Sequence, residues 1–199
     1  KADVWLDGVI LKTSMILSGN KAKKRADSQA VGYETLVGLL KTVPAEMPAV
    51  VFLSGGQEDN EVNENLNAVN VASQTRFTEA RDEAVTELTV EGKTEAAAKL
   101  RKLTQSPWQL SYSFGRGLQR QGLKAWQGKD ENFAAAQQAL LESVLTTQAA
   151  RMGKMNKPIV SAEASIKEMA PFESLIAEYV INIAQSKGPG AVTSTEPDT

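Results

Sequence analysis

Lys12 ends a short apolar run, residues 4–11, and is the side chain best placed to do chemistry. The run is rich in β-branched and large apolar residues, which is typical of a buried parallel strand. At a strand end, desolvation or nearby positive charge lowers the pKa of a lysine, and the neutral amine can attack a carbonyl carbon. Strand parity places Lys12 on the same side as Ile10 and Gly8, a face that lines the interior in a barrel. The spacing alone favours a plainer alternative, a surface lysine that ends a strand.

Two glycine turns follow the next two apolar runs and could bind an anion. Ser54-Gly55-Gly56 offers backbone N–H donors and a hydroxyl, and Gly115-Arg116-Gly117 adds a guanidinium suited to bidentate phosphate contact. In (β/α)8 barrels the loops after the last two strands frequently form a phosphate site. Either turn alone is a weak signal, because a glycine-rich turn after a strand is usually only a turn.

The composition excludes several classes of site. The chain has 199 residues, no Cys and no His, which excludes disulfides, Cys nucleophiles, Ser-His-Asp triads and metal sites built on thiolate or imidazole. We expect neither a metal nor another cofactor. The net charge of −2 argues against a nucleic-acid partner or a polybasic membrane anchor, and no apolar run approaches the roughly 20 residues of a membrane helix. The expected partners are small molecules or proteins, and the expected compartment is the cytoplasm.

The order of predicted elements is that of repeated β-α units. Apolar runs predict strands at 4–11, 49–53 and 108–114, each followed by a polar or glycine-containing loop and then by helical sequence. Parallel strands in such units are joined by right-handed crossovers. The predicted helices are at about 28–41 with Ser28 as the N-cap, from 58 onward, within 75–103 as a hairpin that breaks at Gly92, at 130–152 and at 163–184. Residues 185–199 have almost nothing to bury, so we expect a flexible tail.

Four longer motifs occur in a fixed order along the chain. They are Leu6-Asp7-Gly8-Val9-Ile10-Leu11-Lys12, Phe52-Leu53-Ser54-Gly55-Gly56-Gln57, Asn65-Leu66-Asn67-Ala68-Val69-Asn70 and Ser113-Phe114-Gly115-Arg116-Gly117-Leu118-Gln119. Together they resemble the class I fructose-1,6-bisphosphate aldolases, a family that forms a Schiff base with its substrate. Several motifs in one order are far more specific than any single motif.

The resemblance implies an α/β fold in which residues 1–184 form the C-terminal part of a TIM (β/α)8 barrel, about strands 6 to 8 with terminal helices. It implies that Lys12 on the sixth strand forms the imine and that the substrate phosphate is bound by Ser54, Gly55, Gly115 and Arg116. The implied reaction is reversible cleavage of fructose 1,6-bisphosphate to dihydroxyacetone phosphate and glyceraldehyde 3-phosphate, in glycolysis and gluconeogenesis, without a cofactor. A phosphorylated sugar as substrate and a homo-oligomeric assembly are implied as well.

The sequence also departs from the family pattern. Where the family commonly has Pro-Asn-Met after the lysine, this chain has Thr13-Ser14-Met15, and a family tyrosine is replaced by Phe114. Residues 71–106 stand where the family has a short connection, so we expect a helical insertion there. The family's acid/base carboxylates lie on earlier strands, and Lys1 stands where an initiator Met would be. We therefore expect an incomplete fragment of the barrel that is inactive alone.

Two alternative functions stay open at this point. A Schiff-base aldolase for a related phosphorylated sugar would use the same lysine and the same turns. A catalytically silent scaffold would keep the barrel without the chemistry. The basic stretch Lys21 to Arg25 could attract phosphorylated sugars, although a solvated loop is the favoured interpretation.

Overall fold

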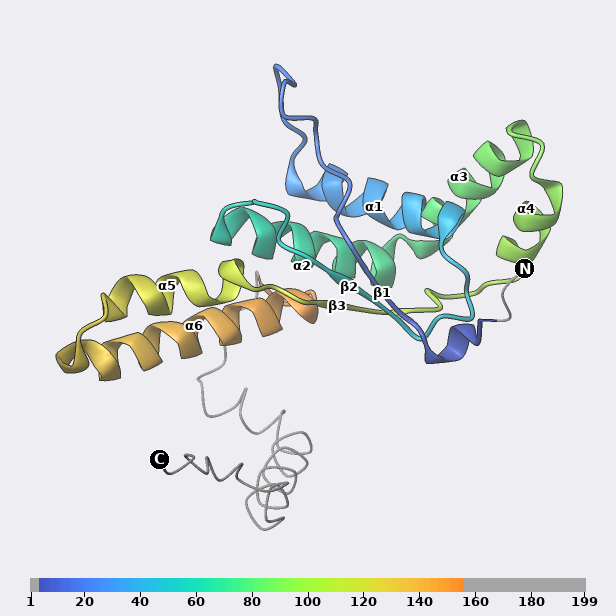
Figure 1. The fold of residues 1–199 in the computed structure, drawn as a ribbon. Coiled ribbons are helices and arrows are strands. Elements are labelled where there is room, and N and C mark those ends of the chain that lie inside the picture. Colours follow the sequence, from blue (N-terminus) through green and yellow to red (C-terminus); the bar gives the residue numbers. More distant parts are fainter. Residues whose placement is uncertain (1–3, 156–199) are drawn as a thin grey trace, which may run out of the picture. The chain divides into compact units, whose positions relative to one another are not determined.

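The computed structural model describes residues 4–155, which alternate between strands and helices and belong to one compact unit, residues 1–158 (Figure 1). The elements are η1 (Leu6–Gly8), β1 (Ile10–Thr13), α1 (Ser28–Thr42), β2 (Ala49–Phe52), α2 (Asp59–Thr75), α3 (Phe77–Val90), α4 (Thr94–Leu100), β3 (Gln109–Tyr112), α5 (Arg116–Trp126), η2 (Asp130–Asn132) and α6 (Phe133–Arg151). The predicted helix at 163–184 and the predicted tail at 185–199 lie outside the described residues.

The three strands form one parallel sheet in the order β1-β2-β3. Lys12 lies opposite Val51, and Val51 lies opposite Ser111, so the strands are in step and their carboxyl ends share one edge. Each strand is followed by a helix, which confirms the predicted β-α order. The strands predicted at 49–53 and 108–114 are confirmed in type and are slightly shorter than expected.

One face of this sheet carries the core. Val50 and Phe52 are fully buried, and they pack with apolar residues of α1 and α2 such as Leu36 and Leu66, which are fully buried too. The alternate positions of β1, Ile10 and Lys12, are exposed. This alternation follows from the period of two along a strand, and it leaves one sheet face without a helix layer in the described part of the chain. In a complete (β/α)8 barrel the helices cover only the outer face of the sheet, so an uncovered face is expected for the strands that line the interior.

The first strand is shorter than the sequence predicts, and the expectation of a strand over 4–11 is wrong for its first half. Residues Leu6–Gly8 form a 3-10 turn, in which the amide of Gly8 donates to the carbonyl of Trp5 at 3.2 Å. The indole of Trp5 donates to the Asp7 carboxylate at 2.9 Å, and Trp5 is 74% exposed. These local hydrogen bonds compete with strand geometry, so the strand begins at Ile10.

Helices α3 and α4 confirm the predicted hairpin with a break at Gly92. Polar contacts join α3 to α1. Lys41 of α1 forms ion pairs with Glu87 and Glu91, and the hydroxyl of Tyr33 donates to Glu83 at 2.6 Å. The predicted helix at 130–152 is confirmed as α6, which a short 3-10 turn precedes.

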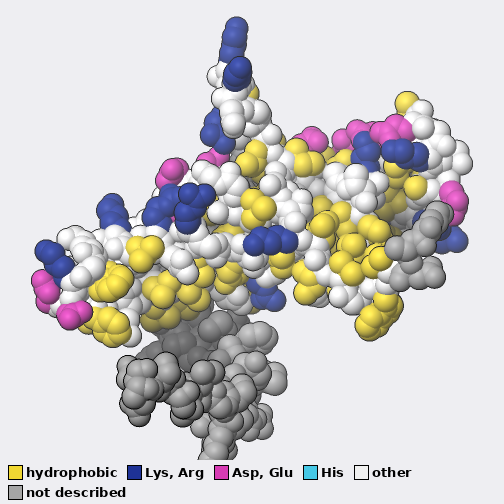
Figure 2. Space-filling model, viewed as in Figure 1, with side chains coloured by type: hydrophobic (Ala, Val, Ile, Leu, Met, Phe, Trp, Pro, Cys, Tyr) yellow, Lys and Arg dark blue, Asp and Glu magenta, His cyan; other side chains and the backbone are white. Residues whose placement is uncertain are grey.

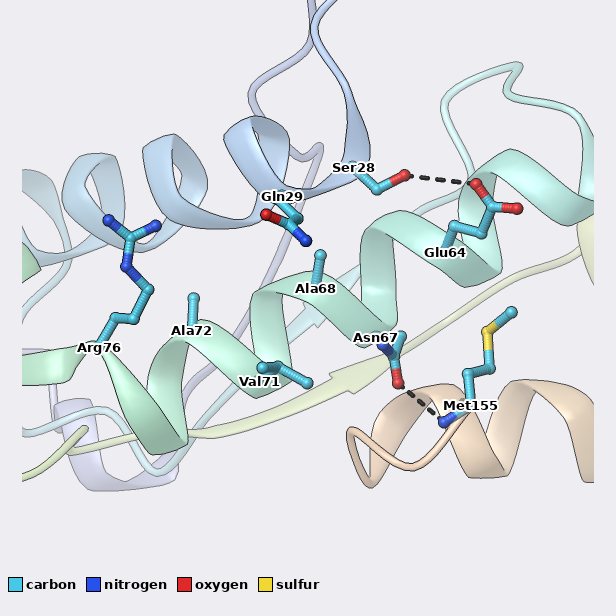
Figure 3. A pocket seen from close by; sticks show the side chains of 9 residues that line it. All are labelled: Ser28, Gln29, Glu64, Asn67, Ala68, Val71, Ala72, Arg76 and Met155. Atoms are coloured by element: carbon cyan, nitrogen blue, oxygen red, sulfur yellow. Dashed lines mark hydrogen bonds between the residues drawn. The ribbon is translucent and has the colours of Figure 1, made fainter. Parts of the chain in front are cut away.

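The α5–α6 pair exposes large apolar side chains, which Figure 2 shows as hydrophobic surface along these helices. The exposed residues are Leu123, Trp126, Phe133, Leu140 and Leu141. A separate hollow of about 470 Å³ lies between α1, α2 and the last described residues (Figure 3). Glu64 and Arg76 line it, and Asn67 accepts a hydrogen bond there from the amide of Met155 at 3.0 Å. None of the site residues predicted from the sequence lines this hollow.

Candidate active site

Lys12 lies in β1 on the sheet face that the helices leave uncovered. Its side chain is exposed and shares that face with Ile10, as strand parity predicts. Gly8 does not share it, because Gly8 belongs to the 3-10 turn rather than to the strand. Among the described residues Lys12 makes no ion pair. Its amine is therefore available to a molecule that enters from the uncovered face.

The segments that follow the three strands leave the sheet side by side. The amide of Leu53 donates to the carbonyl of Thr13 at 2.9 Å, and the amide of Ser113 donates to the carbonyl of Phe52 at 2.8 Å. The parallel ladder thus continues one residue past the end of β2 and one residue past the end of β3. Ser54 follows Leu53 directly, so the first predicted turn starts at the edge where Lys12 lies.

The turn from Ser54 to Gln57 has two consecutive residues in the left-handed region. Gly55 has φ of 59° and Gly56 has φ of 81°, and both residues are exposed. A side chain would be strained at either position, whereas glycine adopts this conformation freely. The amides of Gly55 and Gly56 donate to no protein acceptor within the described chain. They are donors that a bound anion can use.

The glycine-containing turn predicted over residues 115–117 is instead the start of α5, a helix that was not predicted from the sequence. Gly115 is the N-cap, and the carbonyl of Gly115 accepts from the amides of Leu118 and Gln119 at 3.1 and 3.2 Å. Arg116 is therefore the first helical residue of α5, and its side chain is exposed. The first amides of a helix lack intrahelical partners and favour negative charge. An arginine at this position adds a charged fork to those amides.

The structure brings the two turns into contact. A Cβ atom built at Gly117 would lie 3.2 Å from the Cβ and 3.7 Å from the Oγ of Ser54. Glycine at 117 therefore permits Ser54 to approach the first turn of α5 closely. Ser54, Gly55, Gly115 and Arg116 consequently lie around one edge of the sheet, as the sequence predicts, although their role as phosphate ligands stays a prediction.

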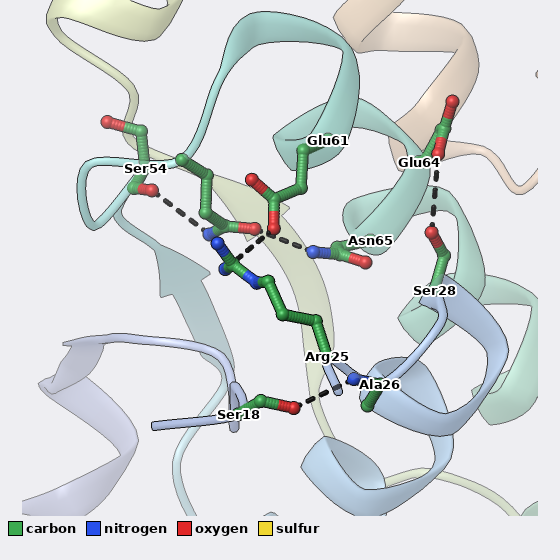
Figure 4. Close-up of polar contacts among 9 residues, drawn as sticks. Ser18, Arg25, Ala26, Ser28, Ser54, Glu61, Glu64 and Asn65 are labelled. Atoms are coloured by element: carbon green, nitrogen blue, oxygen red, sulfur yellow. Dashed lines mark hydrogen bonds and ion pairs between the residues drawn. The ribbon is translucent and has the colours of Figure 1, made fainter. Parts of the chain in front are cut away.

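Sequence reasoning missed a buried polar relay behind the first turn. The side-chain amide of Gln57 donates to the carbonyl of Ser54 at 3.0 Å, and the side-chain amide of Asn65 donates to the Oε1 of Gln57 at 2.7 Å (Figure 4). Gln57 is 4% exposed and Asn65 is 2% exposed. A signal was present in the sequence, because Asn65 interrupts the apolar stripe of α2 formed by Val62, Leu66 and Val69.

Sequence reasoning also missed the ion pairs that join α5 to the first turn of α2. Arg120 contacts Glu58 at 2.7 Å and Asp59 at 3.3 Å, and the side-chain amide of Gln121 donates to Asp59 at 2.8 Å. Glu58 directly follows the turn that begins at Ser54, and Arg120 lies one helical turn after Arg116. These contacts therefore join the start of α2, which follows the first turn, to the N-terminal part of α5.

A basic loop leads from β1 to α1 beside the same edge. The hydroxyl of Ser18 accepts from the amide of Ala26 at 2.8 Å and closes the loop, and Arg25 contacts Glu61 in the first turn of α2 at 2.9 Å (Figure 4). At the tip, Lys21, Lys23 and Lys24 are exposed and have no carboxylate partner in the described part of the chain. The projecting basic tip is visible in Figure 2.

Residues 4–155 contain no group of three or more Asp and Glu side chains arranged to hold a metal ion. In the same residues no helix combines the length and the apolar character needed to cross a membrane.

Comparisons with known proteins identify the family. The model of the family described as fructose-bisphosphate aldolase class-I matches residues 1–80 and 84–173, so it includes nearly all of the segment 71–106 that we expected to be an insertion. The chain is 36% identical over 151 residues to fructose-bisphosphate aldolase 2 of Caenorhabditis elegans, which covers 76% of this chain and 33% of that protein. It is 40% identical over 150 residues to the cytoplasmic isozyme 2 of Pisum sativum, which covers 75% and 33%.

A solved structure gives the same result. The chain superposes on fructose-bisphosphate aldolase from Plasmodium falciparum, crystallised with TRAP and a small-molecule inhibitor, with a TM-score of 0.59 and 33% identity over 78% of this chain and 36% of that one. The sheet and helices thus match part of a TIM-barrel aldolase, and the chain spans about a third of the length of the relatives it matches. The chain therefore belongs to the class I fructose-bisphosphate aldolase family.

Proposed function

We propose that β1, β2 and β3 are strands 6 to 8 of an aldolase barrel, and that the complete barrel reversibly cleaves fructose 1,6-bisphosphate to dihydroxyacetone phosphate and glyceraldehyde 3-phosphate. One observation carries this proposal. An unpaired lysine on the uncovered sheet face lies at the edge where the Ser54 turn, with its free glycine amides, meets the start of α5. Barrel enzymes place their active sites at the carboxyl ends of their strands.

Lys12 is the proposed nucleophile. Its neutral amine adds to C2 of the open-chain ketose, and loss of water from the carbinolamine gives a protonated imine. When the C4 hydroxyl loses its proton, the C3–C4 bond breaks, and its electron pair moves through C2 to the imine nitrogen. Glyceraldehyde 3-phosphate leaves and an enamine remains. Protonation of the enamine at C3 and hydrolysis then release dihydroxyacetone phosphate and regenerate the amine.

The two turns are the proposed phosphate site of the ketose end. The hydroxyl of Ser54 and the amide of Gly55 donate from the first turn, and the amide of Gly115 and the guanidinium of Arg116 donate from the second. Binding the phosphate there fixes C2 of the substrate near Lys12 and reduces the entropic cost of the addition step. No metal or organic cofactor takes part in the proposed reaction.

We propose a cytoplasmic, homo-oligomeric enzyme. The Pisum sativum relative is named as a cytoplasmic isozyme, which supports this location. Because the chain spans a third of its relatives, we expect residues 1–199 alone to cleave no measurable fructose 1,6-bisphosphate. Three strands cannot close an eight-stranded barrel, and the proton-transfer groups would have to come from the other strands.

Borohydride trapping tests the proposal. The complete enzyme is incubated with dihydroxyacetone phosphate and borohydride, and the labelled peptide is mapped. A label on Lys12 is expected, and a label on a different lysine would refute the assignment. An unlabelled complete barrel would favour a silent scaffold. Faster cleavage of tagatose 1,6-bisphosphate or fructose 1-phosphate than of fructose 1,6-bisphosphate would favour an aldolase for a related sugar.

A further inference from the structure

The carbonyl of Ser54 accepts two hydrogen bonds from one residue. The backbone amide of Gln57 and the side-chain amide of Gln57 both donate to it at 3.0 Å. The carbonyl is therefore held toward the buried side of the turn. Gln57 itself is almost fully buried, so these bonds are shielded from competition with water.

The direction of this carbonyl determines the direction of a donor at the surface. Ser54 C=O and Gly55 N–H belong to the same trans peptide plane, so they point in opposite directions. When the carbonyl points inward to Gln57, the amide of Gly55 points outward. That amide donates to no protein group in the described chain, and Gly55 is exposed. Because consecutive glycines restrict the backbone very little, the turn needs an external hold to keep this orientation.

Asn65 determines which end of the Gln57 amide faces the turn. The Nδ2 of Asn65 donates to the Oε1 of Gln57 at 2.7 Å, so the Nε2 of Gln57 must face the carbonyl of Ser54. An acceptor in place of that donor would repel Oε1 and favour the flipped amide. The flipped amide presents an oxygen to the Ser54 carbonyl, and the two oxygens repel each other.

We propose that Gln57 and Asn65 are positioning residues that aim the amide of Gly55 at the phosphate group of the substrate. The proposal rests on the proposed function of the Ser54 turn. Gln57, just before α2, and Asn65, within α2, would thus act in recognising the phosphate rather than in the bond-breaking step. Loss of the relay should therefore weaken binding of phosphorylated substrates specifically.

Asn65→Asp in the complete enzyme is the sharpest test, with Asn70→Asp as its matched control. Asn70 is also a buried asparagine of α2, but its side-chain amide donates only to the carbonyl of Leu66 in the same helix, at 3.0 Å. Asn65→Ser, a neutral change, and Gln57→Met, an apolar change of similar size, are second variants if Asn65→Asp does not fold. Steady-state cleavage of fructose 1,6-bisphosphate is compared with trapping of dihydroxyacetone, which has no phosphate.

We expect KM for fructose 1,6-bisphosphate to rise about 10- to 100-fold in Asn65→Asp, since one charge-assisted hydrogen bond is lost. The kcat and the trapping of dihydroxyacetone should change less than about threefold. If Asn70→Asp raises KM equally, or if dihydroxyacetone trapping falls in parallel, the positioning role is refuted. Trapping with the unmutated enzyme is done before any variant is made. If no adduct forms at Lys12, the proposed function is refuted independently of the positioning role.

Discussion

In the described part of the chain, the helix layer holds charged side chains in ion pairs, whereas the carboxyl edge of the sheet carries unpaired cations beside the paired Arg25 and Arg120. Between α1, α2 and α3, charged and polar groups find partners within the fold: Lys41 with Glu87 and Glu91, Arg76 with Glu79 and the Tyr33 ring, and Tyr33 with Glu83. At the carboxyl edge, Lys12 and Arg116 have no carboxylate partner within the described residues, and the amides of Gly55 and Gly56 have no acceptor.

Two lysines show the difference most clearly. The carboxylates of Glu87 and Glu91 hydrogen-bond to Lys41 and raise its pKa, which keeps this lysine protonated and unreactive. Lys12 has no such neighbour among the residues described. A cationic side chain that is ion-paired within the protein contributes to its stability. An unpaired one beside free N–H donors can bind an anionic ligand or, as a neutral amine, react with it.

The largest expected difference between the two regions is the difference in kcat between variants of Lys12 and Lys41. In the complete enzyme, Lys12→Met should lower kcat by at least about 10³-fold, because removing a covalent nucleophile removes the reaction path it provides. Lys41→Met should leave kcat unchanged and lower the melting temperature, because it leaves Glu87 and Glu91 without a partner. Cleavage assays and thermal unfolding of both variants measure the two effects. Equal losses of kcat would show that the two regions do not differ in function.

Two arginines give the next largest contrast. Arg116→Ala removes a charge-assisted contact with the proposed phosphate, for which a loss of about 1.5–3 kcal/mol is expected, or about 10- to 100-fold in KM. Arg76→Ala removes a contact with Glu79 and with the Tyr33 ring, so it should not alter KM. Initial rates at varied concentrations of fructose 1,6-bisphosphate give KM for both variants. An unchanged KM in Arg116→Ala would exclude Arg116 from the phosphate site.

Tyr33, which is buried in the helix layer, should make the stability of the protein depend on pH without affecting catalysis. Burial and the hydrogen bond to Glu83 raise the pKa of Tyr33 above its ordinary value near 10. Above about pH 10 the unfolded chain releases this proton and the folded chain keeps it, so stability falls as pH rises. Tyr33→Phe should lower the free energy of unfolding by about 1 kcal/mol at neutral pH, and the difference from the unmutated enzyme should narrow above about pH 10.

Urea unfolding of both proteins from pH 7 to 11 measures this effect. Catalysis at neutral pH should be the same in both, because Tyr33 is buried away from the sheet edge. A constant difference across the range would mean that Tyr33 does not titrate differently in the folded state.

The sequence predicts those elements whose formation depends on local patterns. The runs at 49–53 and 108–114 are apolar enough to specify buried strands, and the helix predicted at about 28–41 is confirmed as α1. Its N-cap is Asp27 rather than the predicted Ser28, and the Asp27 carboxylate accepts from the amide of Ala30 at 2.9 Å. The first strand was overestimated because one contact, from Trp5 to Asp7, favours a turn. The helix α5 was not predicted, because Gly115-Arg116-Gly117 looks like a turn in the sequence, whereas Gly115 is the N-cap of a helix.

The candidate site was predicted only in its exposed parts. Lys12 and the two glycine turns were singled out because they follow predicted strands, and the resemblance to the aldolase family, rather than their spacing, assigned Lys12, Ser54, Gly55, Gly115 and Arg116 to one site. Gln57 and Asn65 were missed because their importance depends on a tertiary contact between a turn and a helix. A polar residue inside an apolar helical stripe is the sequence signal that would reveal such a relay.

The smallest effect concerns the basic loop, whose tip carries three exposed lysines without carboxylate partners in the described chain. Replacing Lys21, Lys23 and Lys24 with Gln should lower kcat/KM for fructose 1,6-bisphosphate by about threefold at low ionic strength, because positive charge near a site speeds the encounter with an anion. The matched control replaces Lys99, Lys102 and Lys129, which are exposed on other parts of the chain, so the net charge changes equally.

Ionic strength separates steering from direct contact. At about 10 mM salt the screening length is roughly 30 Å, and at 0.15 M it is about 8 Å, so the loop variant should approach the unmutated enzyme as salt is added. Arg116→Ala should not recover, because it loses a hydrogen-bonded contact rather than a distant attraction. Measurements of kcat/KM across this salt range, with kcat expected to stay constant, distinguish the two kinds of cation. If the loop variant and its control have the same kcat/KM at low salt, the three lysines do not attract the substrate and form only a solvated loop.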